Sequence, residues 1–278
     1  MGVFVTIIIL LAVMVATAYA FLILPRVTDA ADMELQATDY AHRGLWNKQL
    51  PENSLAAFAF AKSKGYGIEL DVQLSRDGKV VVFHDESLER MCGIEGKVSD
   101  FTAEELKSFS LLGTEHKIPL LSEVLELIGG RVSILIEIKG GNGKNYNKEL
   151  CLTLAEILDG YGGAFSVQAF NPFVLAWFRK FRPRFARGQL VTNSRNYKKE
   201  LKGKHPKLVA FALSHMLTNV ISRPDFISIE GTFMSSPELF ILTRIFKTKG
   251  FVWTARNPKA YQRIRDKEMF AIFEIIRP

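Results

Sequence analysis

Cysteine is scarce in this chain, with only Cys92 and Cys151 among 278 residues. Their spacing matches no zinc-binding or redox motif, so the sequence offers no sulfur-ligated metal site. Free thiols and a single bridge both remain open, and two ordinary buried thiols are the favoured interpretation. The cysteines therefore do not indicate a cellular compartment.

Linker sequence rich in proline, glycine and serine is also absent, which favours one large domain over two small ones. Charge is absent from residues 3–24, a run of 22 residues. Such a run is long enough to cross the ~30 Å hydrocarbon core of a bilayer. A cleaved signal peptide is the alternative, because residues 18–20 (Ala-Tyr-Ala) resemble a processing site.

Two features argue against cleavage. No Lys or Arg precedes the apolar run, and residues 21–24 continue it past the processing site. We therefore predict a retained single-pass membrane anchor at 1–26 and one folded domain at 37–278. The side of the membrane stays open, because Arg26 is offset by three nearby acids.

The net charge of +7 is unevenly spread, since residues 179–207 contain a single acid. A solvated helix face plus a loop explains most of these cations, and attraction to anionic lipid headgroups is the functional interpretation. Nucleic-acid binding is not expected, because exposed aromatics do not alternate with the cations. The basic residues are Arg179, Lys180, Arg182, Arg184, Arg187, Arg195, Lys198, Lys199, Lys202, Lys204 and Lys207.

Strand-like and helix-like runs alternate along the rest of the chain, which predicts an α/β fold with a parallel sheet, and the length fits a (β/α)₈ TIM barrel. Helices are expected from the 3.6-residue periodicity, with Asn53 as a cap for the first. The expected strands are 38–42, 67–72, 79–84, 132–138, 164–168, 186–191, 225–229, 251–254 and 269–276. The expected helices are 54–64, 102–109, 121–128, 148–158, 172–181 and 236–247.

Nine strands are one too many for an eight-stranded barrel. Only seven residues separate Val72 from Val80, with Asp77-Gly78 between them, which is too short for a crossover helix and suits a hairpin. Folding the chain back at Asp77 places His84 opposite Leu70. The hairpin therefore returns His84 to the strand that it leaves.

Three carboxylates lie in otherwise apolar strands. Glu69 and Asp71 are two residues apart and share a face, and Glu137 comes late in a later strand. A structural salt bridge explains one buried acid, but three converging acids need a stronger reason. We predict that they bind Mg²⁺ or Ca²⁺, which prefer oxygen ligands.

Two histidines follow strands, His42 and His84, and each has a charged neighbour. Either alone is weak evidence, because a single histidine commonly fills a hydrogen-bonding niche. Together they suit an acid–base pair, in which one removes a proton and the other supplies one. Arg43 and Lys139 are suited to hold phosphate oxygens.

These residues resemble the glycerophosphodiester phosphodiesterase family, which also includes phospholipase D-type enzymes. Seven ordered motifs carry the resemblance, and two weaker ones extend it over most of the chain. The seven lie at 41–44, 51–54, 69–72, 77–78, 83–85, 117–120 and 136–139, and the weaker two at 166–170 and 252–254.

The resemblance implies a TIM barrel with a small insertion after the second strand, at about 86–120. It implies a divalent cation held by Glu69, Asp71 and Glu137, with His42 and His84 exchanging protons. The implied reaction is hydrolysis of a glycerophosphodiester to sn-glycerol 3-phosphate and an alcohol. Gln168, Phe170 and Trp253 are candidates for the substrate pocket, although aromatic residues serve as plain core at least as often.

One feature departs from the family pattern. Members commonly finish with a strand that carries Thr-Asp before a final Pro, whereas this chain ends in residues 273–278, Phe-Glu-Ile-Ile-Arg-Pro. Either this part of the barrel mouth is altered or the alignment with the family fails there. Two alternatives accompany the diesterase. The anchor and the basic run suggest a lysophospholipase D-like enzyme acting on intact membrane lipid, and the atypical C-terminus suggests a non-catalytic, membrane-tethered lipid-binding barrel.

Overall fold

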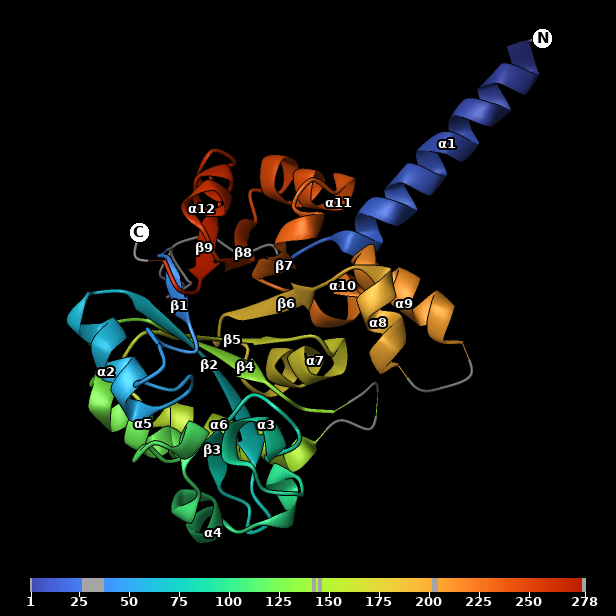
Figure 1. Cartoon of the computed structure of the whole chain (residues 1–278). Helices are drawn as coiled ribbons and strands as arrows, with labels where there is room; N and C mark the ends of the chain where they lie inside the picture. Colours follow the sequence, from blue (N-terminus) through green and yellow to red (C-terminus); the bar gives the residue numbers. More distant parts are fainter. Residues whose placement is uncertain (1, 27–37, 142–143, 145–146, 202–204, 277–278) are drawn as a thin grey trace.

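The computed structural model describes residues 2–26, 38–141, 144, 147–201 and 205–276 (Figure 1). The predicted domain boundary at residue 37 and the last two residues lie outside the described part. Both cysteines are free thiols, Cys151 buried and Cys92 partly so. Burial raises the pKa of Cys92 to about 11 and that of Cys151 to about 12, as expected for unreactive structural thiols.

The strands form one closed barrel. Eight of them are parallel, and closure is complete because β1 pairs with both β2 and β9. The predicted barrel is therefore confirmed. The strands are β1 (Tyr40–His42), β2 (Gly67–Leu74), β3 (Val80–Val82), β4 (Ile134–Ile138), β5 (Phe165–Ala169), β6 (Arg187–Val191), β7 (Phe226–Glu230), β8 (Lys249–Ala255) and β9 (Phe270–Phe273).

The additional strand, β3, forms the predicted hairpin with β2. β3 runs antiparallel to β2, with Val82 opposite Val72. The backbone N–H of Phe83 donates to the carbonyl of Asp71 at 2.9 Å, so the pairing continues past β3 and sets His84 beside the end of β2. The predicted return of His84 is thus confirmed.

Apolar side chains fill both sides of the barrel wall, as expected for a parallel sheet covered by helices. All five residues of β4 are buried. Inside the barrel, Tyr40, Leu135, Phe226 and Phe251 belong to one cluster, which closes the interior below the C-terminal ends of the strands. The buried acids Glu69, Asp71 and Glu137 lie on the C-terminal side of this cluster.

Helices surround the barrel (Figure 1). The six predicted helices are present, but Ser54 rather than Asn53 caps the first, its hydroxyl accepting from the N–H of Ala57 at 3.2 Å. The sequence missed α3, α9, α10 and the mostly polar helices α8 and α12. The helices are α2 (Leu55–Ser63), α3 (Glu89–Cys92), α4 (Ala103–Ser108), α5 (Leu121–Ile128), α6 (Lys148–Asp159), α7 (Pro172–Phe181), α8 (Ser194–Glu200), α9 (Pro206–Ser214), α10 (Asn219–Ser222), α11 (Pro237–Phe240, continued as a π-helix over Ile241–Ile245) and α12 (Pro258–Arg265).

The segment between β3 and α5 forms the predicted insertion. It contains α3, α4 and two short 3₁₀ turns, Val98–Asp100 and Leu111–Gly113. Its apolar side chains make a separate small core with β3, which includes Phe83, Leu88 and Leu106. The insertion is therefore a packed unit that adjoins the hairpin carrying His84.

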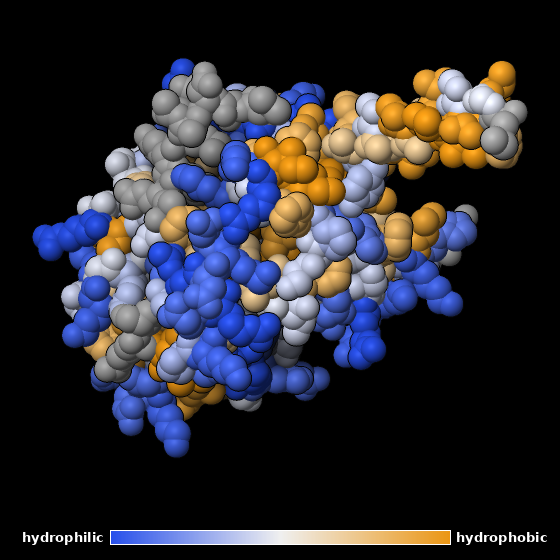
Figure 2. Space-filling model, turned by 90° about the horizontal axis from the view of Figure 1, so that it is seen from above, coloured by the Kyte–Doolittle hydropathy of each residue, from blue (hydrophilic) through white to orange (hydrophobic). Residues whose placement is uncertain are grey.

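The first helix, α1 (Gly2–Ile23), protrudes from the barrel, and its apolar surface is exposed along most of its length (Figure 1). It is long and apolar enough to cross a bilayer, a property that signal sequences share. Its last turn docks on the domain: Ile23 is buried, and its carbonyl accepts from the amide of Asn219 at 3.1 Å. Figure 2 shows hydrophobic surface along this helix and on the body near its base.

Candidate active site

The C-terminal ends of β1, β2 and β4 place the predicted site residues side by side. Strand register sets His42 opposite Glu69, and Asp71 opposite Glu137. Because alternate residues of a strand share a face, Glu69 and Asp71 both point into the barrel. Residues 95 positions apart in sequence thus meet at one mouth.

The three carboxylates are buried and form one cluster. One oxygen each from Glu69, Asp71 and Glu137 lies within 4.8 Å of the others. The Nζ of Lys139 lies 3.0 Å from Asp71 and 2.5 Å from Glu137. Arg43 adds a second cation, with Nε 3.4 Å from Asp71. Two cations therefore face three acids.

The electrostatics of the cluster are unbalanced around Glu69. Burial, together with the charges of Asp71 and Glu137, raises the pKa of Glu69 well above its usual value. Burial also opposes ionisation of Asp71, but Lys139, His84 and Arg43 outweigh it and hold the pKa of Asp71 low. The donor set is three hard oxygen ligands with excess negative charge, which fits a divalent cation such as Mg²⁺ or Ca²⁺.

His42 is held by an acid that the sequence analysis misjudged. Its Nδ1 lies 2.6 Å from Oε1 of Glu274, whose other oxygen accepts from Nε of Arg256 at 2.6 Å. Burial opposes ionisation of Glu274, but the bonds to His42 and Arg256 lower its pKa to about 2. The Nε2 of His42 faces the cluster, 4.0 Å from Glu69.

Glu274 corrects the expectation of an altered mouth at the C-terminus. It immediately follows the apolar strand β9 and points inward, so a carboxylate is present where the departure from the Thr-Asp pattern cast doubt. The same signal that identified Glu137, an acid late in an apolar strand, would have found it.

His84 is arranged in a similar way on the other side of the cluster. Its Nδ1 lies 2.6 Å from Asp85, which also accepts from Nε of Arg90 at 2.5 Å. Burial opposes ionisation of Asp85, but His84 and Arg90 outweigh it and lower the pKa of Asp85. Each candidate histidine therefore has a carboxylate on Nδ1.

Arg43 connects the cluster to the insertion. Its backbone N–H donates to Glu69 at 3.2 Å, and its guanidinium donates to Glu52 at 2.7 Å. Glu52 also accepts from Arg90 of α3 at 2.7 Å. Burial disfavours the charge of Arg43, but Asp71, Glu52 and Glu69 outweigh this and raise its pKa.

Asn53 is a further residue that the sequence analysis did not assign to the site. Its amide donates to Oδ2 of Asp71 at 2.9 Å, and its backbone adopts a left-handed φ of 56°. Asparagine tolerates this conformation better than most residues. The motif at 51–54 was recognised in the sequence, but its role in orienting Arg43 and Asp71 needs the tertiary contacts.

Comparison with known proteins agrees with this geometry. The model of the glycerophosphoryl diester phosphodiesterase family matches residues 42–273. The chain belongs to this family.

Curated relatives match over part of the chain. A glycerophosphodiester phosphodiesterase of Caldanaerobacter subterraneus is 49% identical over 109 residues, which cover 36% of this chain and 44% of that protein. A human lysophospholipase D is 34% identical over 132 residues, covering 39% of this chain and 41% of that protein. The matches thus span less than half of the length of these relatives.

Solved structures match over most of the chain. The glycerophosphodiester phosphodiesterase of Thermotoga maritima has 30% identity and a TM-score of 0.63, covering 85% of this chain and 94% of that one. An Oleispira antarctica phosphodiesterase, solved with its product sn-glycerol-3-phosphate, has 24% identity and a TM-score of 0.69, covering 85% and 92%. At that identity the second match shows the fold alone.

The mouth of this family member also has an aromatic side. Phe170 follows β5 and meets Trp253 of β8 edge to face, with ring centroids 5.9 Å apart. Gln168 points to the cluster, its amide donating to Glu69 at 3.3 Å. Gln168 therefore lies beside the ionic cluster, in register with Glu137, while Phe170, just after β5, and Trp253 of β8 contact each other.

Glu230, another residue without a predicted role, ends β7 and pairs in register with Trp253. Its carboxylate accepts from the hydroxyl of Thr192 and from the amides of Asn193 and Asn196. Burial opposes its ionisation, but these hydrogen bonds outweigh it and lower the pKa of Glu230. The aromatic side of the mouth thus also carries a stabilised anion.

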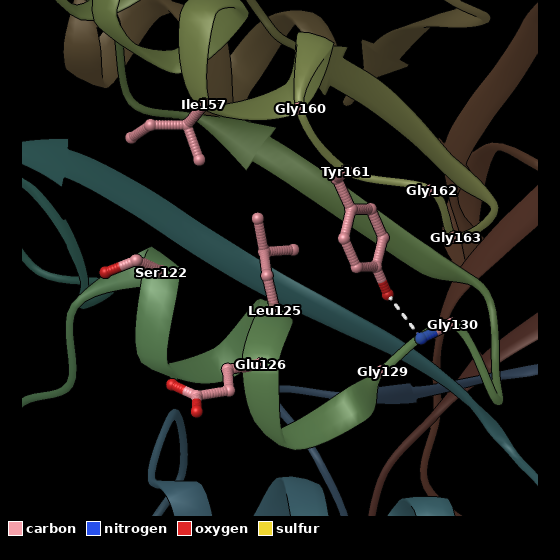
Figure 3. Close-up of a pocket in the computed structure, with 10 residues that line it drawn as sticks. All are labelled: Ser122, Leu125, Glu126, Gly129, Gly130, Ile157, Gly160, Tyr161, Gly162 and Gly163. Carbon is pink, nitrogen blue, oxygen red and sulfur yellow. Dashed lines mark hydrogen bonds between the residues drawn. The ribbon is translucent and has the colours of Figure 1, made fainter.

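A separate surface hollow lies at the opposite end of the barrel (Figure 3). It is lined by the C-terminal ends of α5 and α6 and by glycines that precede β4 and β5. The Tyr161 hydroxyl accepts from the N–H of Gly130 at 3.1 Å across it. Since this is the N-terminal face of the strands, and none of its ten lining residues is a predicted site residue, we assign it no catalytic role.

Proposed function

We propose that this protein hydrolyses glycerophosphodiesters to sn-glycerol 3-phosphate and an alcohol. The observation that carries the proposal is the convergence of two carboxylate-bonded histidines, three buried acids and two cations at one barrel mouth. The family match and the names of the relatives support the same reaction class.

In this proposal His42 and His84 exchange the protons of the reaction. One removes a proton from the attacking water, and the other protonates the departing alcohol oxygen. Glu274 and Asp85 occupy Nδ1 of the two rings, so Nε2 is the nitrogen available to the substrate in each case. The assignment of acid and base between the two histidines is left open.

The remaining site residues position the phosphodiester. Glu69, Asp71 and Glu137 would hold a divalent cation, Mg²⁺ or Ca²⁺, which supplies positive charge for the phosphate oxygens. Arg43 and Lys139 stabilise the same oxygens, Arg43 through its planar fork and Lys139 as a point charge. Gln168, Phe170 and Trp253 line the pocket for the glycerol.

We also propose that residues 1–26 are a single-pass membrane anchor for the domain at 37–278, with basic surface toward anionic lipid. The exposed, uncharged α1 supports the anchor. The basic run is smaller than the sequence suggested, because Arg187 is buried and Arg182 pairs with Asp159. Lys202 and Lys204 lie outside the described residues.

An assay on the full chain in proteoliposomes tests the reaction. Glycerol phosphate release from glycerophosphocholine is measured with chelator and after Mg²⁺ or Ca²⁺ is restored. Asp71→Asn should abolish release, whereas Asp159→Asn, which removes a surface acid paired with Arg182, should not. If the unmodified protein releases no more glycerol phosphate than Asp71→Asn does, the proposal is contradicted and a non-catalytic lipid-binding barrel is favoured.

A lysophospholipase D-like activity is the second candidate, favoured by the protruding apolar helix. It requires faster turnover on lysophospholipid in vesicles than on glycerophosphocholine in solution. The same preparations, compared at equal substrate concentration, distinguish the two activities.

A further inference from the structure

Helix α9 exposes apolar side chains on its outer face. Leu208, Val209 and Phe211 are 66%, 44% and 49% exposed, while Ala210 and Leu213 face the domain and are buried. A helix that covers a soluble core normally carries polar residues on its outer face. The outer face of α9 therefore needs a second explanation.

A short chain of contacts connects this face to α1. The ring of Phe211 lies 4.2 Å from that of His215, whose Nδ1 is 2.7 Å from Glu238 of α11. Glu238 in turn interacts electrostatically with Tyr19 of α1. The outer face of α9 thus lies close to the level at which α1 leaves the domain (Figure 1).

Helix α10, which follows α9, packs against the C-terminal end of α1. Asn219 and Arg223 bind carbonyls of the last turn of α1, and the Arg223 guanidinium lies 4.7 Å from the ring of Phe21. A tyrosine near the end of a spanning helix, such as Tyr19, is typical of the membrane interface. A bilayer around α1 would therefore reach its interface beside α9 and α10.

Charge around α9 suits a lipid surface. Lys207 on α9 and Lys198 and Lys199 on α8 are exposed, and they flank the apolar face. An apolar face bordered by lysines is the pattern of helices that lie in the membrane interface.

We propose that α9 is a second membrane contact, with Leu208, Val209 and Phe211 inserted among lipids beside the anchor α1. This inference rests on the proposed anchoring and is independent of the proposed reaction. The commitment to lipid follows from the contacts that connect α9 to the base of α1 through His215 and Glu238, and from the nearby lysines.

The contact also connects lipid to the barrel mouth. Helix α8 packs against α9, and Asn193, which caps α8, donates to Glu230 at the mouth. Insertion of α9 would thus hold the loop after β6 in place, so lipid contact would act on the mouth through Asn193. Substrate presented by vesicles should benefit more than substrate in solution.

Depth-dependent fluorescence quenching tests the inference without any activity measurement. Leu208→Cys is labelled with an environment-sensitive fluorophore in a Cys92→Ser, Cys151→Ala background, and the full chain is reconstituted with nitroxide-labelled lipid. Leu152→Cys on α6, 47% exposed, is the matched control. We expect at least twofold stronger quenching at position 208 than at 152. Equal quenching, or crosslinking of position 208 between two copies of the chain, would overturn the inference.

A double variant separates this contact from the reaction. Leu208→Ser with Phe211→Ser should lower turnover of vesicle-borne substrate severalfold, through a higher apparent KM, and leave turnover of glycerophosphocholine in solution unchanged. The exposed positions make unfolding unexpected, which circular dichroism verifies. An equal loss on both substrates would contradict membrane insertion. Inactivity of the unmodified protein on both would refute the reaction and leave the quenching result intact.

Discussion

At the N-terminal end of the barrel, Arg187 and Asp225 form a buried ion pair, whereas the C-terminal mouth gathers three buried carboxylates around two cations. Around Arg187, the backbone N–H donates to Asp225 at 2.9 Å, and the guanidinium donates to carbonyls of Ser222 and Arg223. Arg26 also lies 3.5 Å from Asp225, so cations outnumber acids at this end, whereas acids outnumber cations at the mouth.

The pKa shifts express this difference. Burial lowers the pKa of Arg187 to about 10 and raises that of Asp225, and each is the main countercharge for the other. At the mouth, neighbouring acids add to burial in raising the pKa of Glu69. An end without an excess of acids offers no cation site, whereas the acid-rich cluster at the mouth would attract a further cation. The predictions below test this distinction in order of expected effect.

The largest effect is expected from His42→Ala. Loss of an acid or base should lower kcat by about 10²–10⁴-fold. His215→Ala is a matched control, because His215 also pairs with a carboxylate but lies outside the mouth. Steady-state kinetics on glycerophosphocholine measure both variants, and equal rates for them would remove His42 from the mechanism.

At the N-terminal end of the barrel, Asp225→Ala should destabilise the protein without a specific loss of catalysis. Removing one partner of a buried pair leaves Arg187 uncompensated, which costs about 3–5 kcal/mol. Urea denaturation of the full chain in detergent measures the free energy of unfolding. If the variant has the same free energy of unfolding as the unmodified protein, water must solvate Arg187 in the variant.

A divalent cation should stabilise the protein only through the acid cluster at the mouth. A cation present at 100 times its Kd adds about 2.7 kcal/mol to the free energy of unfolding, which raises Tm by several degrees. Asp71→Asn should remove this response, and Asp225→Ala should retain it. If differential scanning calorimetry shows no change in Tm when Mg²⁺ or Ca²⁺ is added, the metal assignment is contradicted.

A smaller effect is expected from Glu274→Gln. The carboxylate orients His42, so kcat should fall about 10–100-fold, less than for His42→Ala. A fall in kcat with KM unchanged would support an orienting role, since glutamine keeps the size of the side chain. A loss equal to that of His42→Ala would instead place Glu274 in the proton transfer itself.

Glu274 also predicts a dependence of stability on pH. Its pKa is depressed to about 2 in the folded protein, so its contribution is present above the unfolded value of about 4.3 and is lost as pH falls toward 2. The free energy of unfolding of Glu274→Gln should therefore fall less steeply between pH 4.5 and 2, values that bracket these two pKa values. Parallel pH dependences, measured by urea titration, would contradict the ionised pair with His42.

The sequence predicted the barrel well because its buried strands are continuous apolar runs bounded by turns. The Asp77-Gly78 hairpin and the acids in β2 and β4 were equally readable, since period-two alternation alone assigns their faces. Helices α8 and α12 were missed because their sequences are mostly polar. Local patterns thus determined the scaffold.

Residues that orient the site were harder to find. Glu52 reaches Arg90, 38 positions away, and His42 reaches Glu274, 232 positions away. The pairing itself leaves no local signal, because the sequence around one partner does not indicate the other. Only the closure of the barrel brings them together, so the roles of Glu52, Asn53 and Glu274 required the structure.

Under the proposed anchoring, the docking of α1 has a consequence for how the protein samples a membrane. The final carbonyls of a helix lack partners within the helix, and here Asn219 and Arg223 supply donors to those of Phe21, Ile23 and Leu24. An anchor fastened in this way holds the domain at one tilt, unlike a flexible tether. Lateral diffusion would then carry the mouth over the bilayer at constant height, so encounters with substrate become two-dimensional searches.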